Sequence, residues 1–195
     1  MKIGLVGCGK WGRLILRDLC QLGAKVHVTA QTEKTCNIAL NNGATGASVT
    51  LDIGVKVDGY VVAVPTKRHF NVISQLIPSG KPIFCEKPMT ADPAEMDLIL
   101  AQAPDQVFSM DKWRYHLGVL KLAELAQSGA LGNIASVCTY RLGWAHTPSD
   151  VDVAWHLAPH DLSIALEILC YLPPVKSAVG LNVSPTLQSL QAVLQ

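Results

Sequence analysis

The sequence lacks a charge excess, a membrane span and a secretory leader. Lys and Arg number 16 against 15 Asp and Glu, so nothing favours nucleic acid or an acidic membrane surface as a partner. No stretch approaches ~20 uninterrupted apolar residues, the length that spans a bilayer. Glycines, Lys10, Arg13 and Arg17 interrupt the apolar N-terminal segment, unlike a signal peptide. We therefore expect a soluble, cytoplasmic protein that binds neither nucleic acid nor membrane.

The cysteines lack the spacing of a metal site or a disulfide scaffold. No two of them form a Cys-x-x-Cys pair, so we expect small buried hydrophobes in a reducing compartment and predict no metal site. The six positions are Cys8, Cys20, Cys36, Cys85, Cys138 and Cys170. Hydrophobic residues make up 49% of the 195 residues, enough for a substantial core in one large domain or one domain plus a partial second.

The chain begins with a glycine-rich turn between a predicted strand and a predicted helix. The apolar run Lys2 to Val6 leads into Gly7, Gly9 and Gly12, spaced as Gly-x-Gly-x-x-Gly. Gly7 would permit the tight turn, Gly9 the approach of a pyrophosphate and Gly12 close packing of the helix on the strand. The helix N-terminus would then face the phosphates. The helix is predicted to turn four apolar residues inward: Trp11, Ile15, Leu19 and Leu22.

This turn predicts a dinucleotide site, although methyltransferases and purely structural turns share the pattern. The loop residues that we expect at the cofactor also include Cys8, Lys10 and Trp11. After the second predicted strand, 25–30, Gln31 and Thr32 stand where a dinucleotide-binding fold usually places a ribose-binding Asp or Glu. An amide does not repel a 2′-phosphate, which slightly favours NADP over NAD. Gln31 as a solvated strand end, and Glu33 as the ribose ligand, remain open.

Strand and helix patterns then alternate as in a parallel α/β sheet. The predicted strands are 47–49, 58–65, 82–85 and 106–110, and the predicted helices are 34–42, one from a Thr66 cap to Gly80, and one from an Asp92 cap with Pro93 at its first position. This set predicts a doubly wound Rossmann domain over 1–111. A second, truncated α+β domain over 112–195 would contain a helix at 117–127, a long strand at 134–142, a polar loop at 144–153, a helix starting at Pro159, a strand at 175–183 and a helical tail from Ser184.

The chain resembles the Gfo/Idh/MocA oxidoreductases, which include glucose-fructose oxidoreductase and inositol dehydrogenase. Five segments carry the resemblance: Gly7 to Gly12, Ala63 to Thr66 with His69, Gly80 to Met89 with its Glu86-Lys87-Pro88 core, Gly129 to Gly132, and Trp155 to Ile164. The last segment looks most similar to members that oxidise nucleotide-linked amino sugars. The resemblance implies hydride transfer between NAD or NADP and a hydroxyl-bearing carbon of a sugar, nucleotide sugar or cyclitol.

By the same resemblance, Lys87 would hold the reacting hydroxyl and His160 would act as acid or base. Oxidation of a carbinol needs both a base and a cation against the developing alkoxide. His160 follows Pro159 in an expected first helical turn, where the positive end of the helix dipole would keep the imidazole neutral. Asp161 beside it would act in the opposite direction. A capping or packing role for His160 and a surface role for Lys87 are the structural alternatives.

Several other residues are candidates for the two binding sites. Val64, Pro65, Thr66, His69 and Glu86 follow predicted strands at the ligand-binding edge and are expected near the cofactor. Their alternatives are structural, such as His69 in a first helical turn.

At the substrate we expect Arg114, Tyr115 and His156 in addition to the catalytic pair. A domain-junction role for Arg114 is equally open. His156 departs from the family, where relatives that use a carboxylate carry Asp. Its spacing from His160 is that of a metal pair, but no third ligand is evident.

Family members continue beyond the point where this sequence stops. The tail could cover the exposed face of the second-domain sheet, a partner chain could cover it, or the chain could be a truncated relative with reduced activity. We expect a homo-oligomer formed through that sheet. A catalytically inactive cofactor-binding or regulatory protein is the main rival to the dehydrogenase. A methyltransferase is a third reading, which leaves Glu86-Lys87-Pro88 unexplained.

Overall fold

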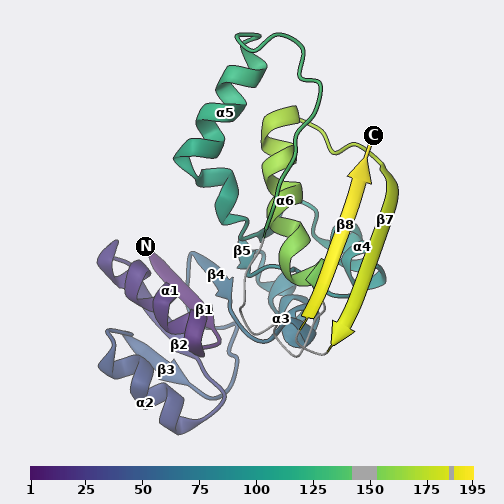
Figure 1. The fold of residues 1–195 in the computed structure, drawn as a ribbon. Coiled ribbons are helices and arrows are strands. Elements are labelled where there is room, and N and C mark those ends of the chain that lie inside the picture. The colour runs from purple at the N-terminus through teal and green to yellow at the C-terminus, as the bar shows by residue number, and fades with distance from the viewer. Residues whose placement is uncertain (142–152, 185–186) are drawn as a thin grey trace. The chain divides into compact units, whose positions relative to one another are not determined.

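The computed structural model describes residues 1–141, 153–184 and 187–195, and the chain divides into two compact units, Met1–Met110 and Asp111–Gln195 (Figure 1). The first unit is built on a six-stranded parallel sheet in the order β3-β2-β1-β4-β5-β6. This order is that of the dinucleotide-binding Rossmann fold and confirms the predicted fold class. The strands are β1 (Lys2–Val6), β2 (Lys25–Thr29), β3 (Gly46–Ser48), β4 (Gly59–Val62), β5 (Ile83–Cys85) and β6 (Val107–Ser109).

The helices of this unit are α1 (Lys10–Gln21), α2 (Glu33–Asn41), α3 (His69–Leu76) and α4 (Pro93–Gln102), with 3-10 turns η1 (Thr66–Arg68) and η2 (Ile77–Ser79). Local chemistry explains several of their ends. Asp92 caps α4 by accepting a bond from the Ala94 N–H at 2.9 Å, with Pro93 at the first helical position. Gly43 after α2 and Gly80 after η2 have positive φ angles, as helix-ending glycines often do.

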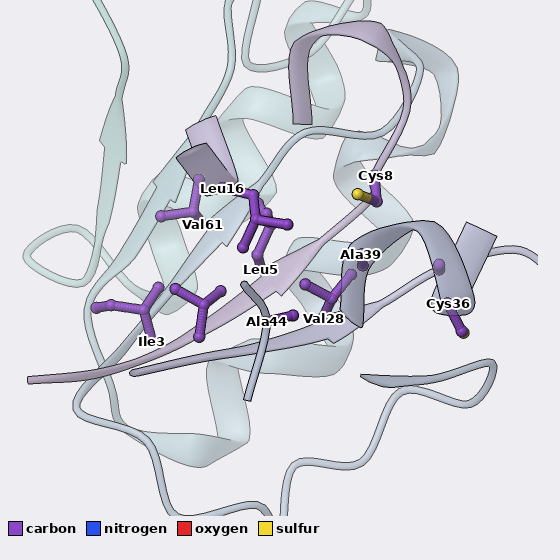
Figure 2. Close-up of a cluster of buried hydrophobic side chains, with 11 residues drawn as sticks. Ile3, Leu5, Cys8, Leu16, Val28, Cys36, Ala39, Ala44 and Val61 are labelled. Atoms are coloured by element: carbon purple, nitrogen blue, oxygen red, sulfur yellow. The ribbon is translucent and has the colours of Figure 1, made fainter. Parts of the chain in front are cut away.

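The two faces of the sheet bury two separate hydrophobic clusters, because successive strand residues point to opposite faces. On one face, Leu5 and Val28 pack with Leu16 of α1 and Ala39 of α2 (Figure 2). On the other face, the cluster combines β1, β4 and β5 with α3 and α4: Val6, Tyr60, Val62, Ile83, Cys85, Val72, Ile73, Leu76 and Ile99. These layers hold the carboxyl ends of the strands, where ligands bind in such sheets, at one edge.

Two expectations for these helices are wrong. Of the predicted inward face of α1, Ile15 and Leu19 do pack, half-buried, against the core, but Trp11 is 62% and Leu22 83% exposed. The fully buried residues of α1 are Gly12 and Leu16. A bulky Trp stays outside because Gly12, one position further, is the residue pressed against the loop. Thr66 begins η1, and the N-cap of α3 is Arg68.

The second unit contains η3 (Lys112–Tyr115), α5 (Leu117–Gln127), α6 (Val153–Leu169) and an antiparallel pair, β7 (Val175–Ser184) and β8 (Leu187–Leu194). The helix predicted at 117–127 and the strand predicted at 175–183 are confirmed. The tail predicted to be helical is instead strand β8, because β7 offers it a partner along its length. Residues 134–141 form no strand, since no strand in the described ranges pairs with them.

The helix predicted to start at Pro159 begins at Val153 and carries Pro159 in its interior. His160 therefore lies in the middle of a 17-residue helix, and the dipole argument for its neutral form, which needs a first-turn position, is wrong. The polar loop predicted at 144–153 lies outside the described residues, apart from Val153. Across the described ranges, no helix combines the length and apolarity that crossing a membrane would require.

Candidate functional site

The glycine loop has the geometry that its sequence spacing predicts. Gly7 has a φ of 98°, and a Cβ there would lie 2.4 Å from the carbonyl oxygen of Ala63. A Cβ on Gly12 would lie 2.2 Å from the carbonyl oxygen of Gly7. These two glycines are therefore required by the protein's own packing, between the loop and β4 and between α1 and the loop.

Gly9 is different, because a Cβ there would meet nothing within 4 Å. It is the N-cap residue of α1, and no side-chain hydrogen bond caps the first-turn N–H groups of this helix. Open space in front of a helix N-terminus at the carboxyl edge of β1 fits a dinucleotide pyrophosphate. Lys10 and Trp11 lie exposed beside this space.

The Cys8 side chain points away from this space, into the core cluster behind the loop. Burial raises the pKa of its thiol, and the neighbouring Arg13 acts in the opposite direction. Any contact of Cys8 with a cofactor would be through its backbone.

Gln31 is exposed between β2 and α2, at the position predicted for a ribose ligand. Thr32 beside it caps α2, because its Oγ1 accepts a bond from the Thr35 N–H at 3.2 Å. Gln31 is thus the freer of the two side chains for contact with a ribose or a 2′-phosphate.

The turns after β4 and β5 lie together at the same edge of the sheet. The parallel register places Val62 opposite Cys85, and the Glu86 N–H donates to the Val62 carbonyl at 2.9 Å. Glu86 and Lys87 follow directly, both half-buried, and the Lys87 N–H lies 3.2 Å from Glu86 Oε2. The carboxyl edge therefore carries Lys87 on the same side of the sheet as the glycine loop.

His69 lies under these turns rather than facing outward. It is 1% exposed, and its two ring nitrogens lie within 2.9 Å of two backbone carbonyl oxygens. These contacts favour the structural alternative for His69, and its place beside a cofactor stays a prediction. Thr66 nearby is also buried, at 9% exposure.

A cavity of about 730 Å³ in this unit lies at the opposite edge of the sheet. Its lining includes Lys2 and Lys25 at the starts of β1 and β2, and Asp58 and Lys81 just before β4 and β5. Ligands of such sheets bind at the carboxyl ends of the strands, so this cavity is not the predicted cofactor site.

In the second unit, His160 lies in a cluster of aromatic and charged side chains. It is 8% exposed, and its ring meets the Trp113 ring edge-on at a centroid distance of 6.4 Å. Arg141 binds Asp161 through two contacts of 3.1 Å and lies 5.1 Å above the Trp113 ring. The Asp161 carboxylate, expected to oppose the effect of the helix dipole on His160, is thus paired with a guanidinium. No sequence pattern indicated this role for Arg141, because it depends on a contact 20 residues away.

Arg114 forms an ion pair within the second unit. Its Nε lies 3.0 Å from Glu167 Oε2, and this hydrogen bond is the main cause of the raised pKa of the guanidinium. The observation favours the structural alternative for Arg114. Tyr115 is 74% exposed, and His156 is half-buried one helical turn before His160 on α6.

Lys87 and His160 belong to different units, each of which is described by itself. Among the residues that the structure describes, no three His, Cys, Asp or Glu side chains are placed to hold one metal ion. The site residues of the first unit together define a dinucleotide-binding Rossmann protein with a lysine at its ligand-binding edge.

Comparison with known proteins identifies the family. Residues 1–107 match the family described as "Oxidoreductase family, NAD-binding Rossmann fold", Gfo/Idh/MocA. The chain belongs to this family, as the resemblance in the sequence predicted.

The curated relatives include proteins of inositol and rhizopine metabolism. The rhizopine catabolism protein MocA of Rhizobium meliloti is 28% identical over 156 residues, which are 75% of this chain and 48% of the relative. Inositol 2-dehydrogenase 2 of Saccharopolyspora erythraea is 27% identical over 184 residues, 87% of this chain and 54% of the relative. The chain spans about half the length of these relatives.

Solved structures share the fold. An oxidoreductase of Thermotoga maritima has a TM-score of 0.76 at 20% identity, over 100% of this chain and 69% of that one. The scyllo-inositol dehydrogenase of Lactobacillus casei, solved with NAD(H) and scyllo-inositol, has a TM-score of 0.70 at 19% identity, over 93% of this chain and 60% of that one. At these identities the likeness establishes the fold.

Proposed function

We propose that the protein is an NAD(P)-dependent oxidoreductase acting on a hydroxyl-bearing carbon of a sugar, nucleotide sugar or cyclitol. The observation that carries the proposal is the position of Lys87, directly after β5 at the same carboxyl edge as the glycine loop. Membership of an oxidoreductase family and relatives named as inositol dehydrogenases support this substrate class.

Gly7, Gly9 and Gly12 would hold the cofactor's pyrophosphate, with the first-turn N–H groups of α1 as donors. Gln31 would face the adenosine ribose, where its neutral amide tolerates a 2′-phosphate and leans toward NADP. Val64, Pro65, Thr66 and Glu86 would line the nicotinamide half of the site. Titration with NADH and NADPH, in the wild type and in Gln31→Asp, tests the preference. The carboxylate should weaken the binding of NADPH more than the binding of NADH.

A bound nicotinamide would supply the hydride acceptor or donor. For the protein's part, the Lys87 ammonium would stabilise the negative charge that forms on the substrate oxygen as its O–H bond breaks. A ring nitrogen of His160 would take that proton during oxidation and return it during reduction. His156 and Tyr115 are the remaining candidates for substrate contact, and Arg114 would have to leave Glu167 to join them.

The role of Lys87 is tested by Lys87→Ala with Lys81→Ala as the control, since Lys81 lies at the opposite edge of the sheet. We expect Lys87→Ala to lower kcat by roughly 10²-fold or more, with a much smaller change in the Kd for NADH, because the charge acts mainly in the transition state. Equal losses in both quantities would mean that Lys87 binds cofactor and does not assist the chemistry.

A calorimetric titration with NADH and NADPH, followed by a fluorescence-monitored panel of polyols and nucleotide sugars, tests the activity itself. Turnover of one member of the panel supports the proposal. Tight cofactor binding with no oxidation of any member contradicts it in favour of a non-catalytic cofactor-binding protein. Absence of nicotinamide binding would revive the methyltransferase reading.

We also propose that a second copy of the chain packs on the β7–β8 sheet. A sheet of two strands is marginal without further packing, and this one leaves Val175 65%, Val179 60% and Val193 47% exposed. Light scattering at micromolar concentration should give twice the monomer mass or more. A monomer mass at that concentration contradicts the proposal.

A further inference from the structure

His69 is the most deeply buried polar side chain in the described part of the first unit and makes two backbone contacts. Its Nδ1 lies 2.9 Å from the carbonyl oxygen of Pro88, and its Nε2 lies 2.8 Å from the carbonyl oxygen of Val64. Both distances are typical of N–H···O hydrogen bonds. Each partner is a carbonyl oxygen, which can only accept.

These two contacts place the ring between the backbones of two turns. An imidazole N–H donates to a carbonyl oxygen, and which of the two nitrogens donates depends on the tautomer. In either tautomer the ring lies within hydrogen-bond distance of both carbonyl groups.

The two carbonyl groups belong to the two turns that form the ligand-binding edge. Val64 follows β4, and Pro88 follows β5 directly after Lys87. The sheet joins these strands as far as the bond from Glu86 N–H to Val62 O, and His69 then joins the turns beyond it. Its ring is therefore the bridge between the backbone beside the predicted nicotinamide site and the backbone next to Lys87.

We propose that His69 is a positioning residue whose buried ring joins the turns after β4 and β5 and so holds Lys87 in place. The proposal rests on the proposed function of Lys87.

The hydrogen bonding of the ring is tested on the wild type by ¹⁵N–¹H correlation spectra of the histidine rings. A ring N–H proton of His69 should be observed and should be protected from exchange. The absence of a protected ring N–H would overturn the bridge. This experiment requires neither turnover nor a folded variant, so it stands even if the proposed activity fails.

The positioning role is tested by His69→Phe, which keeps a ring without donors, and by His69→Gln, whose amide can still donate to one carbonyl. His27→Gln is the matched control, because His27 lies on β2 of the same sheet, away from these turns. We expect His69→Phe to lower kcat on the order of 10²-fold, as for a displaced catalytic group, with a smaller change in KM, and His69→Gln to restore part of the loss.

Backbone amide shifts of Glu86 and Lys87 should move in His69→Phe and not in His27→Gln. Unchanged shifts and unchanged kcat in a folded His69→Phe would overturn the positioning role. If kcat is also unchanged in Lys87→Ala, the proposed function has failed, and the amide shifts alone test whether His69 joins the two turns. If His69→Phe does not fold, the amide shifts of His69→Gln and the wild-type ring spectra provide that test.

Discussion

The three glycines of the loop differ in what surrounds them, although they form one motif. Gly7 and Gly12 face backbone carbonyl oxygens at distances that no Cβ tolerates, whereas Gly9 faces open space. The first two glycines are therefore structural requirements, and the third is the position where a ligand would come close. Substitution separates the two roles.

Gly12→Ala should destabilise the fold, and Gly9→Ala should weaken the binding of the cofactor. The Gly12 methyl group would overpack the loop and cost about 1–3 kcal/mol, partly offset by roughly 1 kcal/mol of better helix propensity. Gly9→Ala should unfold in denaturant like the wild type but bind NADH less tightly. Chemical denaturation and NADH fluorescence titration measure the two effects, and a Gly9→Ala variant with wild-type affinity would contradict the assignment.

Cys85 makes stability depend on pH in the alkaline range. Burial, and secondarily Glu86, raises the pKa of this thiol, so the folded state keeps its proton. The unfolded chain loses that proton above about pH 8.5, the ordinary pKa of cysteine. Stability from this source is therefore present below that pH and falls as pH rises further. Denaturation curves at pH 8 and 10 should show a smaller alkaline loss in Cys85→Ala than in the wild type; equal losses would contradict the prediction.

At the scale of elements, helix ends follow local side-chain chemistry closely. The sequence Asp92-Pro93 predicts the start of α4, and the structure shows the capping bond to Ala94. Asp92→Ala should cost about 1 kcal/mol in the free energy of unfolding because the cap is lost. Asp97→Ala, an exposed change in the middle of the same helix, should cost less. Comparable losses in the two variants would show that the cap does not stabilise α4.

The elements that could not be predicted depend on contacts far along the chain. Pro159 suggested a helix start, yet α6 begins at Val153, because packing of the helix outweighs the hydrogen bond that a proline cannot donate. The leucines at 187, 190 and 194 have helical spacing, but β7 pairs with this segment and makes it a strand. The local sequence pattern was sufficient to predict the parallel sheet, because Gly, Pro and capping residues mark the ends of its strands and helices.

The residues of the candidate site likewise differ in how far the sequence could predict them. The phosphate loop and the Glu86-Lys87 turn could be located from sequence, since both are short motifs at strand ends. The contact of His69 with the Pro88 carbonyl and the Arg141–Asp161 pair could not, because they join residues 19 and 20 positions apart.

At the scale of the whole molecule, cofactor binding should stabilise the two units unequally. At 100 times its Kd, NADH would contribute about 2.7 kcal/mol to the state that binds it. Because the glycine loop lies between β1 and α1, amides of β1 and β4 should exchange more slowly with NADH present, and amides of β7 and β8 should change less. Hydrogen exchange with and without NADH measures this, and slowing confined to β7 and β8 would contradict the placement of the site.

Met1 and Lys2 line the cavity at the edge of the sheet opposite the glycine loop. A sensor chip coupled through the α-amino group of Met1 would hold the Rossmann unit by its amino-terminal edge. The phosphate loop would then face the flowing solution, so nicotinamide nucleotides could be compared on immobilised protein without the attachment chemistry obstructing their entry.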